Sequence, residues 1–241
     1  MKKTLSLILA FVMCLSLCAC GANGNAPETT APETTAPETA APETAAPEEV
    51  KMSKDEMLAI AEEYTATNLQ NDSIENIVRA KQKYCNKTIL FSGTITNIQE
   101  DHIEVSAISG SNYMMDVYLS IDELVELEDG QYITVVGTTT DEIKDSSQSV
   151  GGTTFRFKHY QMPVAYFVKD TLELTGILKG VNSSYNPAFN IQIGESNVLK
   201  LIYFAESVDT STLKFGQKIT FVAKVKSTGS STRYYDAEII G

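Results

Sequence analysis

The feature that most constrains this chain is a repeated unit of about 80 residues after residue 87. The segment 130–137 (GQYITVVG) returns at 216–223 (GQKITFVA), an offset of 86 residues. An upstream pair, 91–95 (FSGTI) and 174–178 (LTGIL), keeps the same order at an offset of 83 residues. Two matches at nearly equal offsets predict a duplication, so we expect two similar domains rather than one large core.

Both copies contain the same sequence of predicted elements: three strands, a short helix and two further strands. Apolar residues alternate with period two, and a glycine interrupts the long first strand of each copy, at Gly93 and Gly176. This is the element order of an OB-fold, a five-stranded Greek-key barrel. We therefore predict a mainly β protein with two tandem OB-fold-like five-stranded barrels, residues 86–168 and 169–241. The predicted strands are 88–98, 102–107, 112–119, 132–140 and 155–168, then 171–181, 189–193, 198–204, 218–227 and 233–240, with short helices at 121–127 and 206–213 and a loop at 141–152.

The segment 53–85 has the pattern of a helical lead-in to the first barrel. Ser53 and Glu56 have the spacing of a capping box, in which each side chain satisfies a free backbone amide. A second helix start is predicted at Asp72, ahead of apolar residues at helical spacing. We expect these helices to pack on the first barrel.

The N-terminus predicts export and lipid attachment. Lys2 and Lys3 precede an apolar stretch, residues 5–17, which is too short to span a bilayer but is typical of a cleaved signal peptide. Residues 17–20 (LCAC) resemble a bacterial lipoprotein signal, so we predict a signal peptide over 1–19 and a lipid on Cys20. Cys18 departs from the Ser or Ala usual at that position of the signal. Residues 20–52 contain five APE repeats with no apolar face to bury, which predicts a disordered stalk.

Charge separates the two copies. The whole chain has a formal net charge of −12, whereas residues 51–168 carry 9 basic and 18 acidic residues and residues 169–241 carry 8 and 7. An acidic protein is poorly suited to non-specific nucleic-acid binding, which depends on Lys and Arg neutralising phosphates. We therefore do not expect a nucleic acid as the partner.

The sequence contains no pattern of residues that predicts catalysis, a metal site or a cofactor. Beyond the anchor, Cys85 is the one cysteine expected after signal cleavage, so no internal disulfide is expected, and it is interpreted as a small buried side chain. His102 and His159 lack metal-ligand spacing and are interpreted as ordinary strand residues. No nucleophile and base can be paired from the sequence, so we predict that the protein is not an enzyme.

Two surfaces are candidates for ligand binding. On the strand after the 141–152 loop, alternation puts Arg156, Lys158 and Tyr160 on one face, where cations and an aromatic ring could bind bases or sugars. The alternative is a solvated strand face. In the second copy Lys218, Lys224 and Lys226 share one face and Arg233 follows on the next strand. These cations could bind a polyanion such as teichoic acid, anionic lipid or extracellular nucleic acid, or they could only protect the strand from aggregation.

The first copy resembles a known family, the tRNA-anti-like OB-fold lipoproteins of bacteria. The resemblance covers roughly residues 75–143 and rests on short motifs, namely Ala80, Lys83, Tyr84, Lys87, Gly93, Ile95, Gly130, Gln131, Ile133, Thr134, Val135 and Gly137. It implies a barrel similar to anticodon-binding domains, without implying that tRNA is bound. We predict a non-enzymatic binding or scaffolding lipoprotein on the outer face of the cytoplasmic membrane of a Gram-positive cell, with an envelope protein as partner. The alternative is a polyanion, oligonucleotide or oligosaccharide binder that uses the second barrel.

Overall fold

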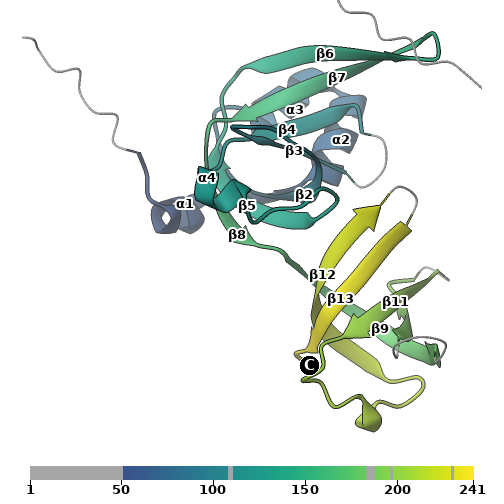
Figure 1. Cartoon of the computed structure of the whole chain (residues 1–241). Helices are drawn as coiled ribbons and strands as arrows, with labels where there is room; N and C mark the ends of the chain where they lie inside the picture. Colours follow the sequence, from purple (N-terminus) through teal and green to yellow (C-terminus); the bar gives the residue numbers. More distant parts are fainter. Residues whose placement is uncertain (1–50, 108–110, 183–187, 196–197, 229–230) are drawn as a thin grey trace, which may run out of the picture. The chain divides into compact units, whose positions relative to one another are not determined.

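The computed structural model describes residues 51–241, apart from 108–110, 183–187, 196–197 and 229–230. The predicted signal peptide, Cys20 and nearly all of the predicted stalk lie outside the described residues. The described part of the chain is mainly β and forms one sheet of eight strands and one closed barrel (Figure 1).

The lead-in is helical but contains a strand that the sequence did not predict. The Ser53–Glu56 capping box is present as expected. The second start predicted at Asp72 is wrong, because Thr65 caps one helix and Asn76 caps the next. The short strand pairs in parallel with the first long strand of the sheet. The elements are α1 (Lys54–Ile60), β1 (Glu62–Thr65), α2 (Ala66–Glu75) and α3 (Ile77–Tyr84).

The first module is an OB-like sheet with an additional hairpin. Its strands follow the order β6-β7-β4-β3-β2-β5-β8, and β4 pairs with β7 in parallel. The predicted loop 141–152 is instead mostly strand, because residues 143–150 pair along their whole length with 153–160. The elements are β2 (Thr88–Ile98), β3 (Ile103–Ser106), β4 (Tyr113–Val117), α4 (Ile121–Leu124), β5 (Tyr132–Thr138), β6 (Ile143–Val150), β7 (Thr153–Met162) and β8 (Val164–Lys169).

The predicted last strand of the first module, 155–168, is divided at Pro163. Proline has no backbone N–H for the ladder, and β7 ends at Met162 while β8 begins at Val164. The first half pairs with β4 and the second half pairs with β5. One continuous stretch of chain therefore meets both ends of the sheet, as the last strand of an OB barrel does.

The second module is the five-stranded barrel that the repeat predicts. Its strands close in the order β10-β11-β13-β12-β9, with β11 and β13 parallel and the remaining pairs antiparallel. The predicted helix at 206–213 is reduced to one 3-10 turn, η1 (Thr210–Thr212). The strands are β9 (Thr171–Asn182), β10 (Ala188–Ile193), β11 (Leu199–Phe204), β12 (Lys218–Thr228) and β13 (Ser231–Ile239).

The interiors confirm the predicted alternation. Ile133, Val135, Ile219 and Phe221 are all at most 2% exposed. Gly176 permits a close approach between strands, because a Cβ there would lie 2.3 Å from Ile191 Cγ2 and 2.8 Å from a backbone oxygen. The duplicated Gly-Gln turns also match in detail, since both glycines have positive φ, 79° and 81°.

Candidate functional site: the β6–β7 hairpin

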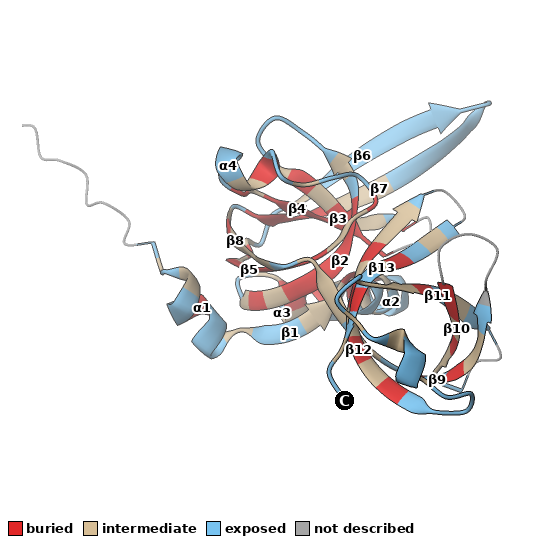
Figure 2. Ribbon diagram, turned by 60° about the horizontal axis from the view of Figure 1, so that its bottom comes forward, coloured by how far each residue is buried: buried red, intermediate tan, exposed pale blue. Residues whose placement is uncertain are grey.

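The β6–β7 hairpin occupies the position of the loop between strands four and five of an OB-fold. It follows β5, the fourth barrel strand, and its second arm pairs with β4, the third barrel strand. In OB-folds this loop and the face of strands two and three are the usual ligand-binding region. Most of β6 and the start of β7 are exposed (Figure 2).

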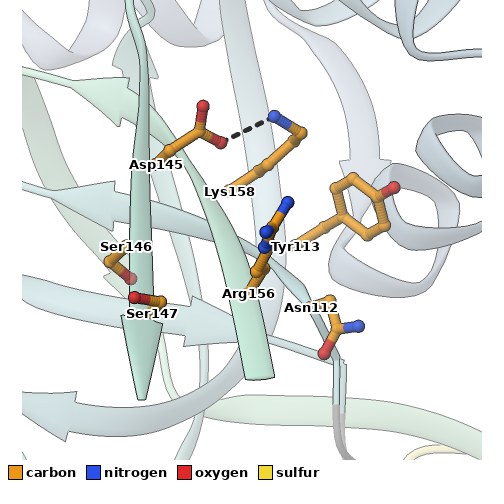
Figure 3. Close-up of a pocket in the computed structure, with 7 residues that line it drawn as sticks. All are labelled: Asn112, Tyr113, Asp145, Ser146, Ser147, Arg156 and Lys158. Carbon is orange, nitrogen blue, oxygen red and sulfur yellow. Dashed lines mark hydrogen bonds and ion pairs between the residues drawn. The ribbon is translucent and has the colours of Figure 1, made fainter. Parts of the chain in front are cut away.

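One side of the hairpin borders a hollow of about 550 Å³. Lys158 Nζ donates to Asp145 Oδ1 at 2.6 Å, and this bond lowers the pKa of the Asp145 carboxyl. Arg156 is exposed and lies two residues before Lys158 on the same strand. In Figure 3, Asp145 and Lys158 reach toward each other, with Arg156 and Tyr113 beside Lys158. The hollow is lined by Asn112, Tyr113, Asp145, Ser146, Ser147, Arg156 and Lys158.

The residues that line this hollow all carry polar groups, and they include both signs of charge. Arg156 makes no ion pair within the described residues, so its guanidinium is available to a ligand. Tyr113 contributes an aromatic ring, and the Asn112 amide and Ser147 hydroxyl offer further hydrogen bonds. The set is suited to a ligand with many hydroxyl groups and a scattered negative charge.

Tyr160 does not belong to this surface, and the prediction that it shares an exposed face with Arg156 and Lys158 is wrong. It is 1% exposed, and its hydroxyl lies 2.9 Å from the Ser73 hydroxyl of α2. Burial, the largest influence, raises the pKa of Tyr160 to about 12. The physical reason is that α2 and α3 cover this end of β7, so both faces of the strand are buried there.

The opposite side of the hairpin holds a chain of hydrogen bonds that the sequence did not reveal. His159 Nε2 lies 2.8 Å from Ser146 Oγ, and His159 Nδ1 lies 2.8 Å from Asp116 Oδ1. Gln161 Nε2 donates to the other oxygen of Asp116 at 2.7 Å. The three linked groups Asp116, His159 and Ser146 come from β4, β7 and β6, so only strand pairing brings them together.

The pKa values of His159 and Asp116 follow from the burial of these side chains and from their hydrogen bonds. The hydrogen bond to Asp116 raises the pKa of His159 above its ordinary value, against the opposing effect of burial. Burial alone would raise the pKa of Asp116, but hydrogen bonds from His159 and Gln161 outweigh it and the pKa lies below the ordinary value. The pair is therefore stabilised as imidazolium and carboxylate.

The basic residues predicted in the second module are partly engaged with acids. Lys224 lies 3.6 Å from Asp170 and 4.0 Å from Asp236, and Lys226 pairs with Glu128. Lys218 is exposed on β12. Arg233 is exposed beside a hollow of about 530 Å³ that is also lined by Tyr203, Tyr235, Lys226 and Glu128.

No helix among the described residues is long and apolar enough to cross a membrane. The same residues contain no group of three His, Cys, Asp or Glu side chains that could hold a metal ion. Cys85 is half-buried at the end of α3, and burial raises the pKa of its thiol.

Comparison with known proteins agrees with this architecture. The fold defines a protein of the OB class, a class of binding domains. The family model described as tRNA_anti-like matches residues 1–146, and the chain belongs to this family. The expected resemblance to the tRNA-anti-like family is thereby confirmed. No match was found among curated proteins. A solved structure titled "Structural mimicry for functional antagonism" aligns over 65% of this chain and 93% of its own, at 9% identity and a TM-score of 0.25.

Proposed function

We propose that this protein is an exported, lipid-anchored binding protein of the cell envelope that binds a sugar chain at the hollow beside the β6–β7 hairpin. The observation that carries the proposal is the position of this hollow, at the third barrel strand and the elaborated loop between strands four and five. This is where OB-folds bind oligosaccharides and oligonucleotides.

Charge favours a sugar chain over a nucleic acid. The first module carries twice as many acidic as basic residues, so it repels a densely charged phosphate backbone. A sugar chain with an occasional carboxylate needs a few well-placed donors instead. Arg156 supplies the charge-assisted bonds, while Asn112 and Ser147 supply neutral ones.

The location of the protein is supported by the sequence alone. The leader that precedes Cys20 is typical of lipoprotein export, and the APE repeats would hold the folded modules away from the membrane. A surface position at the end of a stalk suits a protein that binds envelope polymers. The lipid on Cys20 would be the membrane attachment.

Replacing Arg156 tests the binding proposal. The full-length protein in detergent is titrated calorimetrically with an oligosaccharide that contains uronic acid. Arg156→Ala is expected to weaken binding roughly 10- to 100-fold, because a hydrogen bond to a charged group contributes about 1.5–3 kcal/mol. Arg79→Ala, which removes an exposed arginine of α3 that is paired with Glu75, is the matched control and should leave binding unchanged.

The alternative function, polyanion binding by the second barrel, predicts a different pattern. Binding to single-stranded DNA or teichoic acid would weaken steeply between about 50 and 200 mM salt as counterion release becomes less favourable. Changing Lys218, Lys224 and Lys226 to Glu would abolish it. Loss of binding in this triple variant with no effect of Arg156→Ala would contradict the sugar-binding proposal and favour the alternative.

A further inference from the structure

The chain of hydrogen bonds through Asp116, His159 and Ser146 has the connectivity of an activated nucleophile. A carboxylate accepts only, so Asp116 requires the proton of a neutral imidazole to be on His159 Nδ1. The lone pair on Nε2 then faces the Ser146 hydroxyl at 2.8 Å. A nucleophile within hydrogen-bond reach of a base, which is itself oriented by a third group, is the diagnostic arrangement for nucleophilic catalysis.

Solvent exposure increases along these hydrogen-bonded side chains from Asp116 to Ser146, as such a site requires. Asp116 is 5% exposed and His159 is 8% exposed, whereas Ser146 is exposed on β6. Gln161 holds the second oxygen of Asp116 and is itself buried, so the carboxylate is fixed in one orientation. The orienting group and the base are therefore shielded from water, and the nucleophile is open to a substrate.

We propose that Ser146, His159 and Asp116 form a site for acyl transfer from a carboxylic ester to water. Ser146 Oγ forms a bond to the carbonyl carbon while His159 Nε2 takes the hydroxyl proton. The tetrahedral adduct then breaks the carbon–oxygen bond to the alcohol, which leaves with the proton from His159. Water attacks the resulting acyl-serine, His159 accepts the proton of the water and returns it to Ser146, and the carboxylic acid is released.

The surroundings offer stabilisation to the negative oxygen of the adduct. Lys144 lies opposite His159 in the β6–β7 register, two residues from Ser146 and on the same face, and its positive charge acts on His159. Within the described residues β6 pairs only with β7, so amides along its other edge are open to a substrate oxygen. Glu104, from β3, is the other acidic group besides Asp116 whose charge acts on His159.

A purely structural role is the rival explanation, since Ser146 could simply hold β6 against the sheet. Covalent labelling separates the two. The full-length protein in detergent is treated with a fluorophosphonate, the labelled residue is mapped by peptide mass spectrometry, and p-nitrophenyl acetate hydrolysis is followed in parallel. Labelling is expected on Ser146. Ser146→Ala should abolish it and lower hydrolysis at least about 100-fold, the range that general-base activation supplies.

A second serine of β6, Ser149, is the matched control. Ser149 is exposed, its hydroxyl lies 3.0 Å from that of Thr154, and it makes no bond to His159, so Ser149→Ala should retain labelling and hydrolysis. Absence of labelling in the unchanged protein, or equal labelling of the Ser146→Ala and Ser149→Ala variants, would overturn the proposal. This test uses neither Arg156 nor a sugar, so it stands or fails independently of the proposed binding function.

Asp116 is a positioning residue, and its replacement gives a second test. Asp116→Asn should lower hydrolysis at least about tenfold and bring the His159 pKa, followed by NMR, back toward its ordinary value. In the unchanged protein the labelling rate should rise with pH as His159 loses its proton. A rate that is independent of pH and unaffected by Asp116→Asn would contradict the assignment of His159 as the base.

Discussion

The two modules share one order of strand pairing but differ in closure and in what surrounds the strands. The second module is a closed five-stranded barrel whose only helical element among the described residues is a 3-10 turn. The first module adds three helices before the sheet, a parallel strand and the β6–β7 hairpin. The hairpin pairs with the third strand, β4, whereas the parallel strand β1 pairs with the first, β2. The β6–β7 hairpin is thus an addition at a position where OB-folds bind ligands. The hollow of about 550 Å³ and the buried His159 both lie there.

The two interiors are filled in different ways. In the second barrel three aromatic rings form a connected row, with centroids of Phe189 and Phe204 5.2 Å apart and those of Phe204 and Phe221 6.0 Å apart. In the first module the position equivalent to Phe221 is Val135. There the helices contribute side chains such as Leu69 and Tyr84 to the core. In the second barrel the large strand residue Phe221 thus fills interior space, whereas side chains from helices help to fill the interior of the first module.

Replacing these two equivalent residues with alanine should lower the unfolding free energy by different amounts in the two modules. Phe221→Ala is expected to cost about 3–5 kcal/mol of unfolding free energy, the usual range for a buried Phe. Val135→Ala should cost only about 2 kcal/mol, because it removes two methyl groups of about 0.8 kcal/mol each and leaves a smaller cavity. Urea unfolding followed by circular dichroism measures both values. Equal losses would show that the second core does not depend more strongly on its aromatic row.

The last strands of the two modules carry matching tyrosines with different partners. Tyr160 lies opposite Met115 in the parallel pair of the first module, and Tyr234 lies opposite Ile202 in that of the second. The Tyr160 hydroxyl bonds to the buried Ser73 of α2. No hydrogen bond from the Tyr234 hydroxyl is present within the described residues, and that side chain lies under no helix.

Removing the two hydroxyls should therefore have unequal effects. Tyr160→Phe leaves the buried Ser73 hydroxyl without its partner and is expected to cost about 1–2 kcal/mol. Tyr234→Phe should change stability by less than about 0.5 kcal/mol. Thermal unfolding of both variants measures the difference. A similar small effect in both would mean that the helix–sheet bond does not contribute to the first module.

Much of the architecture could be predicted because its signals are local or repeated. The duplicated Gly-Gln turn and the period-two alternation were sufficient for the barrel order and for the buried face of β12. The hairpin was missed because β6 (IKDSSQSV) has few apolar residues and is exposed, so it has no alternating pattern. Its strand conformation comes from pairing with β7 rather than from burial.

The candidate site was less accessible to sequence reasoning, because its parts meet only through non-local pairing. Arg156 and Lys158 were recognised from their alternation, and both line the hollow. Tyr160 follows the same alternation but is covered by helices that lie more than 70 residues earlier in the chain. His159 had no visible partner in sequence, since Asp116 and Ser146 join it from separate strands. A single sequence carries no signal for the β4–β7 register that brings Asp116 to His159.

The smallest expected effect is a pH dependence confined to the first module. Both histidines of the chain, His102 and His159, lie in that module. The pKa of folded His159 is raised above the ordinary value of 6.5, mainly by its hydrogen bond to Asp116. The contribution of His159 to folding stability is therefore fully present below about pH 6.5 and is lost as the pH rises through its folded-state pKa. The lowered pKa of Asp116 preserves the acidic partner throughout that window, since it loses its charge only at lower pH.

Hydrogen exchange of core amides at about pH 6 and about pH 8, corrected for intrinsic rates, reads the two modules separately. Protection in β4 and β7 should decrease at the higher pH, while protection in β9 and β12 should not change, because residues 169–241 contain no histidine. His159→Gln removes the titrating group and should abolish the decrease in the first module. An equal decrease in both modules, or one that persists in His159→Gln, would mean that some group other than the His159–Asp116 pair sets the pH response.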